Sequence, residues 1–122
     1  MIRLIAGVDV GGTNVVVGTV PEDGSSIHGV TSEPTEKAAG PDGTLVQITR
    51  MVHESLGRTA EELGAGNFEI VGVGIGAPGP LDRKSGTVLL SPNLGWRNMP
   101  LRDLTAAALD LPATLENDAN CA

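Results

Sequence analysis

The stretch GVDVGGTNVVVGTV, residues 7–20, decides the fold. Two runs rich in β-branched residues, 3–10 and 13–20, flank Gly11-Gly12, a pair typical of a two-residue hairpin turn. Asp9 has no packing use in an apolar strand, and adjacent glycines are costly unless the backbone must turn or approach something closely. The stretch therefore predicts a hairpin whose turn lies against a ligand. On spacing alone, a hairpin whose glycines serve only the turn is an equal alternative.

Downstream of this hairpin, the sequence predicts an edge strand and then a helix. The segment IHGVTSE (27–33) alternates polar and apolar residues, which suits an edge strand, and a loop follows at 34–43. Thr44 and Gln47 have the spacing of a capping box at a helix start. The helix is expected to end at Gly64 or Gly66. Its apolar face has residues at helical spacing, namely Leu45, Ile48, Val52, Leu56 and Leu63.

The segment FEIVGVGIGAPGP (68–80) predicts a buried strand that breaks at Pro78. A strand reached through a helical crossover is normally parallel to the strand that it joins. The expected sheet is therefore mixed, with an antiparallel meander of three strands and then a parallel strand. Three further features are expected along the chain: a turn-rich excursion with a small hairpin (81–97), a short helix (100–109) and a last strand (113–117).

Composition and charge exclude several classes of partner. The chain has 122 residues, of which 40 % are hydrophobic and 19 % charged, as in a globular domain. Aromatic residues make up only 2 % and the net charge is −7, which argues against nucleic acid. The single Cys121 cannot form an internal disulfide, so a reducing compartment is expected. No run approaches the roughly 20 apolar residues of a membrane span. We expect a cytoplasmic protein without a membrane or nucleic-acid partner.

The motif DVGGTN (9–14) is suited to phosphate chemistry. A Gly-Gly turn presents successive backbone N–H groups that form an anion-binding concavity, and Thr13 and Asn14 add short polar donors. Asp9 at a strand end can hold a hydrated Mg²⁺ against phosphate oxygens. The chain lacks GxxxxGK[ST], and Pro78 interrupts the helix that a dinucleotide fingerprint would need after GVGIGAPG. The Gly79-Pro80 turn is instead expected to bring backbone close to a ligand.

Two later motifs offer groups for hydroxyl chemistry, each with a plainer alternative. Asn93 in SPNLGW (91–96) is both a donor and an acceptor, as a sugar hydroxyl requires, although the local sequence by itself favours a plain Pro-Asn turn. In LENDAN (115–120), Asp118 is placed to take a proton from a hydroxyl that Asn117 binds. Helix capping is the alternative role of these two residues, and both roles can hold at once. Glu116 is expected to be structural.

The remaining reactive side chains carry little functional signal. His28 and His53 have no second ligand at metal-binding spacing, so no metal site is expected at either. Cys121 is expected to pack in a helix, because no base lies near it in sequence. Trp96 is expected to anchor a loop.

The order of the motifs is more specific than any one of them. GVDVGGTN, GVGIGAPGPLD, SPNLGW and LENDANCA together resemble the N-terminal half of the ROK family of sugar kinases and sugar-responsive repressors. The likeness spans nearly the whole chain and is greatest to the bacterial glucokinases. It implies an α/β fold, the actin-like, ribonuclease-H-like ATPase domain, in agreement with the mixed sheet. Residues 1–122 would form the N-terminal domain, and the family's second domain is not in this chain, which we expect to be part of a longer protein.

The resemblance also implies roles for individual residues. The sugar would contact Gly79, Asn93 and Asn117, and Asp118 would be the catalytic base that deprotonates the hexose 6-hydroxyl. Many family members have Lys at the position of Asn14, although related glucokinases have Asn there. The residues that would meet the phosphates of ATP and the magnesium ion are Asp9, Gly11, Gly12, Thr13 and Asn14.

By resemblance, we expect the phosphorylation of a hexose by ATP, with glucose 6-phosphate as the first candidate product. Kinases of mannose, fructose, N-acetylglucosamine and N-acetylmannosamine share these motifs, and some relatives use polyphosphate. A sugar-sensing regulator is the alternative, but such relatives place a helix-turn-helix segment ahead of the strand that begins here at residue 3. Relatives are commonly dimers, and any structural zinc would lie in the half that this chain lacks. Alone, the chain should be catalytically poor, since half a cleft cannot exclude water.

Overall fold

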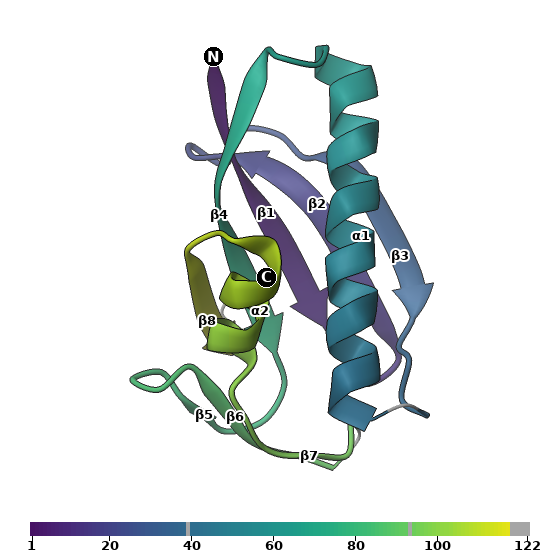
Figure 1. Ribbon diagram of the computed structural model, residues 1–122, viewed down its shortest axis with the longest axis vertical. Helices are drawn as coiled ribbons and strands as arrows, with labels where there is room; N and C mark the ends of the chain where they lie inside the picture. The colour runs from purple at the N-terminus through teal and green to yellow at the C-terminus, as the bar shows by residue number, and fades with distance from the viewer. Residues whose placement is uncertain (39, 93, 118–122) are drawn as a thin grey trace.

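A five-stranded mixed sheet organises the protein (Figure 1). The computed structural model describes residues 1–38, 40–92 and 94–117. The strand order is β3-β2-β1-β4-β8, in which β1 is antiparallel to β2, β2 is antiparallel to β3, and β4 is parallel to both β1 and β8. The predicted meander followed by parallel strands is therefore confirmed. The strands are β1 (Ile2–Val10), β2 (Asn14–Pro21), β3 (His28–Pro34), β4 (Phe68–Ala77) and β8 (Ala113–Asn117).

Strand β1 forms the centre of the sheet because its residues alternate between a core face and an open face. The even-numbered residues Leu4, Ala6, Val8 and Val10 are at most 3 % exposed. The odd-numbered Asp9 points the other way and is exposed, since successive side chains of a strand project to opposite faces. The same alternation therefore builds the core and turns the carboxylate away from it.

Two helices cover one face of the sheet (Figure 1). Helix α1 (Gly40–Leu63) runs against β2 and β3, and α2 (Leu101–Leu109) packs beside β8. Helix α1 buries Ile48, Met51 and Val52 completely and ends, as predicted, at Gly64, whose φ of 90° suits glycine. The predicted start at Thr44 is wrong, because the helix already begins at Gly40 and Thr44 lies inside it.

A second, small sheet continues the same core. It has the order β5-β6-β7 and contains the small hairpin predicted within residues 81–97. Trp96, expected to anchor a loop, instead lies in β7 with 1 % exposure and packs in one cluster with Val88 and Leu101. The small sheet is thus fastened to the main domain by apolar contacts. Its strands are β5 (Leu81–Asp82), β6 (Thr87–Ser91) and β7 (Trp96–Met99).

The turn between β1 and β2 is one residue longer than predicted. It comprises residues 11–13, because Val10 pairs with Val15 and β2 begins at Asn14. A Cβ atom at Gly11 would lie 3.1 Å from the Asn14 carbonyl oxygen. Glycine is therefore the residue that lets this turn close tightly.

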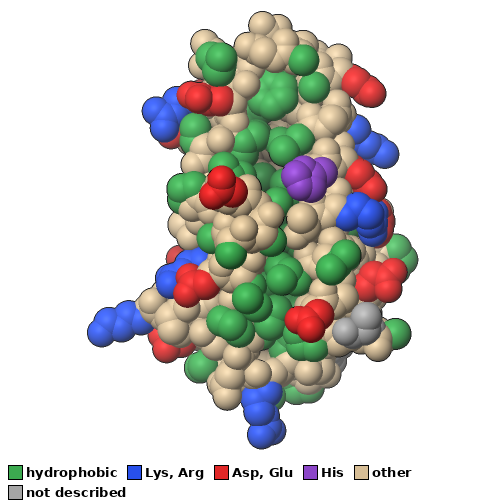
Figure 2. All heavy atoms as spheres, in the orientation of Figure 1, with side chains coloured by type: hydrophobic (Ala, Val, Ile, Leu, Met, Phe, Trp, Pro, Cys, Tyr) green, Lys and Arg blue, Asp and Glu red, His purple; other side chains and the backbone are tan. Residues whose placement is uncertain are grey.

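Hydrophobic side chains gather along the seam between the two helices (Figure 2). A shallow apolar groove of about 340 Å³ lies there, lined by residues from α1 and by Ala108 of α2. Charged side chains lie mostly toward the margins of this face (Figure 2). Within the described residues, no helix has both the length and the apolar character needed to cross a membrane.

The end of α1 is fastened to the start of β3 through Glu62. One carboxylate oxygen accepts the Gly29 N–H at 3.1 Å and the other lies 3.0 Å from His28 Nδ1. His28, expected to be isolated, therefore contacts Glu62, and its Nε2 lies 2.9 Å from Ser26 Oγ. The Gly29 N–H, and secondly His28, hold the pKa of the Glu62 carboxyl below its usual range.

Replacing Glu62 should change how stability depends on pH. Because the pKa of Glu62 is lower in the folded state than in the unfolded chain, its stabilising effect is present above the unfolded pKa. That effect is lost as the pH falls through the folded pKa. We expect Glu62→Gln to lower the free energy of unfolding more at about pH 7 than at about pH 3, as measured by urea denaturation. Glu61→Gln removes the same charge from the same turn and is the control. A loss of equal size at both pH values would contradict the prediction.

Candidate functional site

The carboxyl ends of three parallel strands meet at one edge of the main sheet. In the register of the sheet, Asp9 of β1 is paired with Gly76 of β4, and Gly76 is paired with Glu116 of β8. One residue further along, Ala77 is paired with Asn117. The DVGGTN turn, the turn after β4 and the end of β8 are therefore brought to the same edge, where open α/β sheets commonly bind ligands.

Two carboxylates share one face at this edge. Residues paired across neighbouring strands project to the same side, so Asp9 and Glu116 point in the same direction, with Gly76 between them. Two strand spacings separate their Cα atoms by roughly 10 Å. Gly76 contributes no side chain between the two carboxylates.

A hollow of about 230 Å³ extends from Asp9 along the face of the sheet opposite the helices. Its floor is a row of glycines in register across three strands, Gly18 of β2, Gly7 of β1 and Gly74 of β4. Ile27 closes one side of it. Asp9 thus stands at the end of a smooth surface to which another group can come close.

The turn after β1 is held by hydrogen bonds to its own carbonyls. The Gly11 N–H donates to the Asn14 carbonyl at 2.9 Å, so this donor closes the turn. Thr35, which follows β3, donates its N–H to the Thr13 carbonyl at 2.9 Å and its hydroxyl to the Gly11 carbonyl at 2.7 Å. Thr13 and Asn14 are exposed at the tip. Hydrogen bonds therefore hold the turn in place, while its polar side chains are exposed to solvent.

The second part of the site is formed by the turn after β4 and the end of β8. The Asn117 side-chain amide donates to the Gly79 carbonyl at 3.1 Å. These two residues, with Pro80, Leu81 and Arg83, line a cavity of about 250 Å³. The cavity combines an amide, backbone groups and a guanidinium, which is suitable for binding hydroxyl groups.

An ion pair links this cavity to Glu116, one of the two carboxylates on this face. Arg83 Nη2 lies 2.8 Å from Glu116 Oε2, and both side chains are partly exposed. Arg102 of α2 supports the same hairpin by donating from Nη1 to the Arg83 carbonyl at 3.0 Å. Glu116, predicted to be structural, therefore fastens the small sheet to the end of β8.

Some sequence-predicted site residues are brought together by the fold, and others cannot be placed. Asp9 and the 11–14 turn lie at the same sheet edge as Gly79 and Asn117. Asn93 and Asp118 lie outside the described residues. Thr35 and Arg83 were missed, because each carries a common side chain in a loop and makes its contacts with residues distant in sequence.

The described part of the chain shows no site that would hold a metal through protein side chains alone. No group of three or more His, Cys, Asp or Glu residues there is arranged to hold an ion. Asp9 provides one exposed carboxylate beside a turn rich in polar groups. This donor set fits a Mg²⁺ ion that keeps most of its waters and shares phosphate oxygens, rather than a closed structural site.

Comparison with known proteins agrees with this architecture. A family model described as the ROK family matches residues 5–122. The glucokinase of Streptomyces coelicolor is 38 % identical over 122 residues, which cover 98 % of this chain and 34 % of that protein. The xylose repressor of Caldicellulosiruptor bescii is 51 % identical over 51 residues, which cover 42 % of this chain and 13 % of that protein.

A solved structure gives the same result. The crystal structure of a ROK family glucokinase from Streptomyces griseus, in complex with glucose and AMPPNP, is similar with a TM-score of 0.78 and 35 % identity. The match covers 96 % of this chain and 34 % of that one. The chain therefore spans only a minor part of the length of the relatives that it matches.

Gly79 is the position at which a substitution should most directly disturb the cavity. It has a φ of 87°, and a Cβ atom there would lie 2.3 Å from the Leu90 carbonyl oxygen. We expect Gly79→Ala to lower the free energy of unfolding by about 2–4 kcal/mol, from the left-handed backbone and the clash together. Gly95→Ala is the control, since Gly95 also has a positive φ but no atom of the described residues within 4 Å of its Cβ position. Gly95→Ala should lower the free energy of unfolding by about 1 kcal/mol. Equal decreases for the two variants in urea denaturation would contradict the role of the clash.

Proposed function

This chain belongs to the ROK family, and from that premise we propose that its native-length gene product transfers the γ-phosphoryl group of ATP to a hexose. Glucose is the first candidate, because the glucokinase of Streptomyces coelicolor is 38 % identical over 122 residues. The observation that carries the proposal is the meeting of Asp9, the Gly79 turn and Asn117 at one sheet edge. Phosphoryl transfer needs this juxtaposition of phosphate-binding and hydroxyl-binding groups, since positioning supplies most of the acceleration.

On the phosphate side, the turn from Gly11 to Asn14 would receive the phosphates of ATP. Its glycines allow phosphate oxygens to approach the backbone, and Thr13 and Asn14 add exposed polar side chains. Asp9 would hold Mg²⁺ through water. When bound, the ion neutralises phosphate charge. The chain has a net charge of −7, so the phosphates would depend on this local turn rather than on a basic surface.

On the sugar side, Gly79 and Asn117 would bind hydroxyl groups, together with Asn93. The Asn117 amide already donates one N–H to the Gly79 carbonyl, which fixes the orientation of the amide. Asp118, the next residue, would accept the proton of the hexose 6-hydroxyl as that oxygen bonds to the γ-phosphorus. The bond from phosphorus to the bridging oxygen then breaks, and ADP leaves.

Residues 1–122 would form the N-terminal domain of this kinase, and a second domain would complete the cleft. The chain covers 34 % of the Streptomyces griseus glucokinase. The groups that bind adenosine and the sugar's other hydroxyls would then come from the remainder of the protein. A cytoplasmic location and a role in glucose metabolism belong to the same proposal.

A sugar-sensing regulator is the second candidate function. It is favoured by the 51 % identity to the xylose repressor over 51 residues. A sensor needs the sugar pocket but not a catalytic base, so the two functions differ in what Asp118 does. Sugar binding without turnover would favour the sensor.

The first test is hexose-dependent release of ADP by the native-length product and by its Asp118→Asn variant. We expect the variant to lose about 10²–10⁴-fold in kcat while it still binds the sugar, because only proton transfer is removed. The 122-residue chain alone is a further control, and it should turn over negligibly. Turnover that is equal in the variant would contradict the assignment of the base. If glucose gives no turnover, the same assay with mannose, fructose and the N-acetylhexosamines distinguishes a kinase of another sugar from a sugar sensor.

The phosphate side is tested by nucleotide affinity. We expect Asp9→Ala to raise the Kd for ATP on the order of tenfold in the presence of Mg²⁺ and much less in its absence. Gly12→Val should raise the Kd under both conditions, because its side chain would obstruct the approach of the phosphates. Asp42→Ala, which removes an exposed carboxylate from the start of α1, is the control for charge. Unchanged affinity in both site variants, measured by calorimetry, would overturn this part of the proposal.

A further inference from the structure

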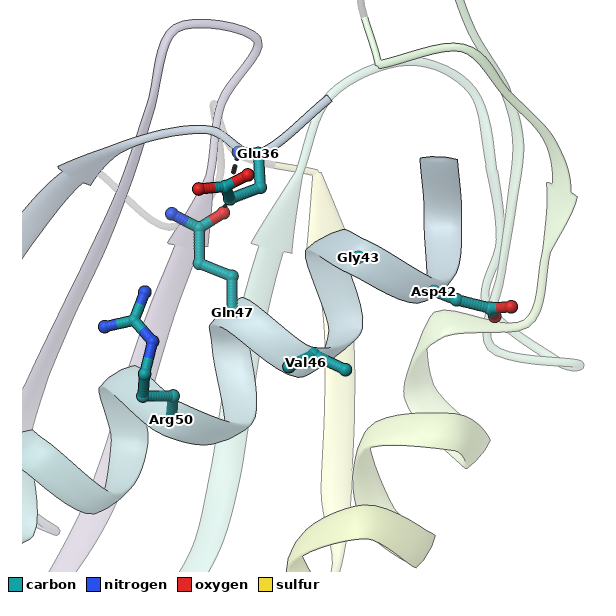
Figure 3. A pocket seen from close by; sticks show the side chains of 6 residues that line it. All are labelled: Glu36, Asp42, Gly43, Val46, Gln47 and Arg50. Carbon is teal, nitrogen blue, oxygen red and sulfur yellow. Dashed lines mark hydrogen bonds between the residues drawn. The ribbon is translucent and has the colours of Figure 1, made fainter. Parts of the chain in front are cut away.

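Helix α1 holds the segment 34–36 by three hydrogen bonds from two buried side chains. Gln47 Oε1 accepts the Glu36 N–H at 2.8 Å (Figure 3). Gln47 Nε2 donates to the Pro34 carbonyl at 2.8 Å. Thr44 Oγ1 donates to the Glu36 carbonyl at 2.9 Å. Gln47 is 2 % exposed and Thr44 is 1 % exposed. Both ends of the Gln47 amide are thus satisfied by backbone groups on either side of Thr35.

Thr35 connects this segment to the turn after β1 by hydrogen bonds. It donates its N–H to the Thr13 carbonyl at 2.9 Å and its hydroxyl to the Gly11 carbonyl at 2.7 Å. One residue therefore clamps both ends of the turn. A continuous series of hydrogen bonds runs from α1 through Gln47, the segment 34–36 and Thr35 to residues 11–13.

The outer side of the segment is open, so it is these bonds that set its position. A cavity of about 420 Å³ lies beside it, lined by Glu36 and Gln47 and by four other residues of α1 (Figure 3). Glu36 itself is exposed. A buried amide that loses its partners leaves backbone groups unsatisfied, at a cost that favours movement of the segment.

We propose that Thr35 and Gln47 are positioning residues for the phosphate-binding turn, with Thr35 acting on the turn and Gln47 acting through Thr35. The inference rests on the proposed function, in which residues 11–14 receive the phosphates of ATP. Neither residue needs to touch the nucleotide. Their effect is to hold the carbonyls of Gly11 and Thr13 inward, so that the remaining polar groups of the turn keep a fixed direction.

The kinetic test compares the KM for ATP with the KM for the hexose in the native-length protein. We expect Thr35→Val to raise the KM for ATP about tenfold, the effect of losing one partly buried hydrogen bond, and to leave the KM for the hexose unchanged. Thr35→Ser keeps the hydroxyl and should restore the wild-type value. Gln47→Met should also raise the KM for ATP. The rise in the double variant should be about the larger of the two single rises and not their sum, because both residues belong to one series of contacts.

Thr49→Val is the matched control. It makes the same Thr-to-Val change on the helix that carries Gln47, but the Thr49 hydroxyl donates within α1, to the Leu45 carbonyl at 2.9 Å. If Thr35→Val raised the KM for ATP and the KM for the hexose equally, the effect would be generally structural and the proposal would be overturned. The same holds if Thr49→Val raised the KM for ATP as much as Thr35→Val does.

Amide hydrogen exchange gives a readout that does not depend on catalysis. We expect faster exchange at the N–H groups of Gly11 and Thr35 in both Thr35→Val and Gln47→Met, with the interior of β2 unchanged, and no such effect in Thr49→Val. Unchanged exchange at Gly11 in both variants would overturn the proposal even if the protein is a kinase. Faster exchange in these variants, combined with a wild-type protein that binds no ATP, would retain the support of the turn and refute the proposed function instead.

Discussion

The register of β1 is the constraint on which the rest of the structure depends. Leu4, Ala6, Val8 and Val10 are buried against the helical layer, so a slip by one residue would expose them and bury Asp9. Burying an unpaired carboxylate in that layer would cost several kcal/mol. Core formation therefore fixes Asp9 on the open face. Parallel pairing with β4, and of β4 with β8, then sets Gly76 and Glu116 in the same row.

Local patterns in the sequence were sufficient to predict this framework. The β-rich runs that flank Gly11-Gly12 identified β1 and β2, and alternation identified β3. The apolar run identified β4, and the crossover rule made β4 parallel to β1. Turn chemistry also located the end of α1 at Gly64. The helix start was misjudged because Thr44 and Gln47 match a capping box in spacing. In the fold, the same side chains bind the segment 34–36, a tertiary role that the local pattern does not reveal.

The candidate site was predictable only in part, for a related physical reason. Asp9 and Asn117 carry a local signal, since a carboxylate or amide at the end of an apolar strand has no packing use there. Thr35 and Arg83 carry none. Their importance arises from contacts with Gly11 and Glu116, distant in sequence, that exist only after the sheet has formed. Sequence patterns therefore located the groups that would meet ligands better than the groups that hold them in place.

The chemistry of the supporting groups would suit the binding of a polyanion, as we propose, by an acidic protein. With a net charge of −7, additional carboxylates around the turn would repel phosphates, and cations there would be drawn to the protein's own acids. Arg83 illustrates the second case, since its guanidinium is paired with Glu116. The turn of residues 11–13 is held by a hydroxyl, and the segment behind it by a neutral amide. Neutral, partly buried hydrogen bonds of this kind depend little on salt and do not titrate near neutral pH. The shape of the turn could thus stay constant during the phosphoryl transfer that we propose, while the charge of the bound nucleotide changes.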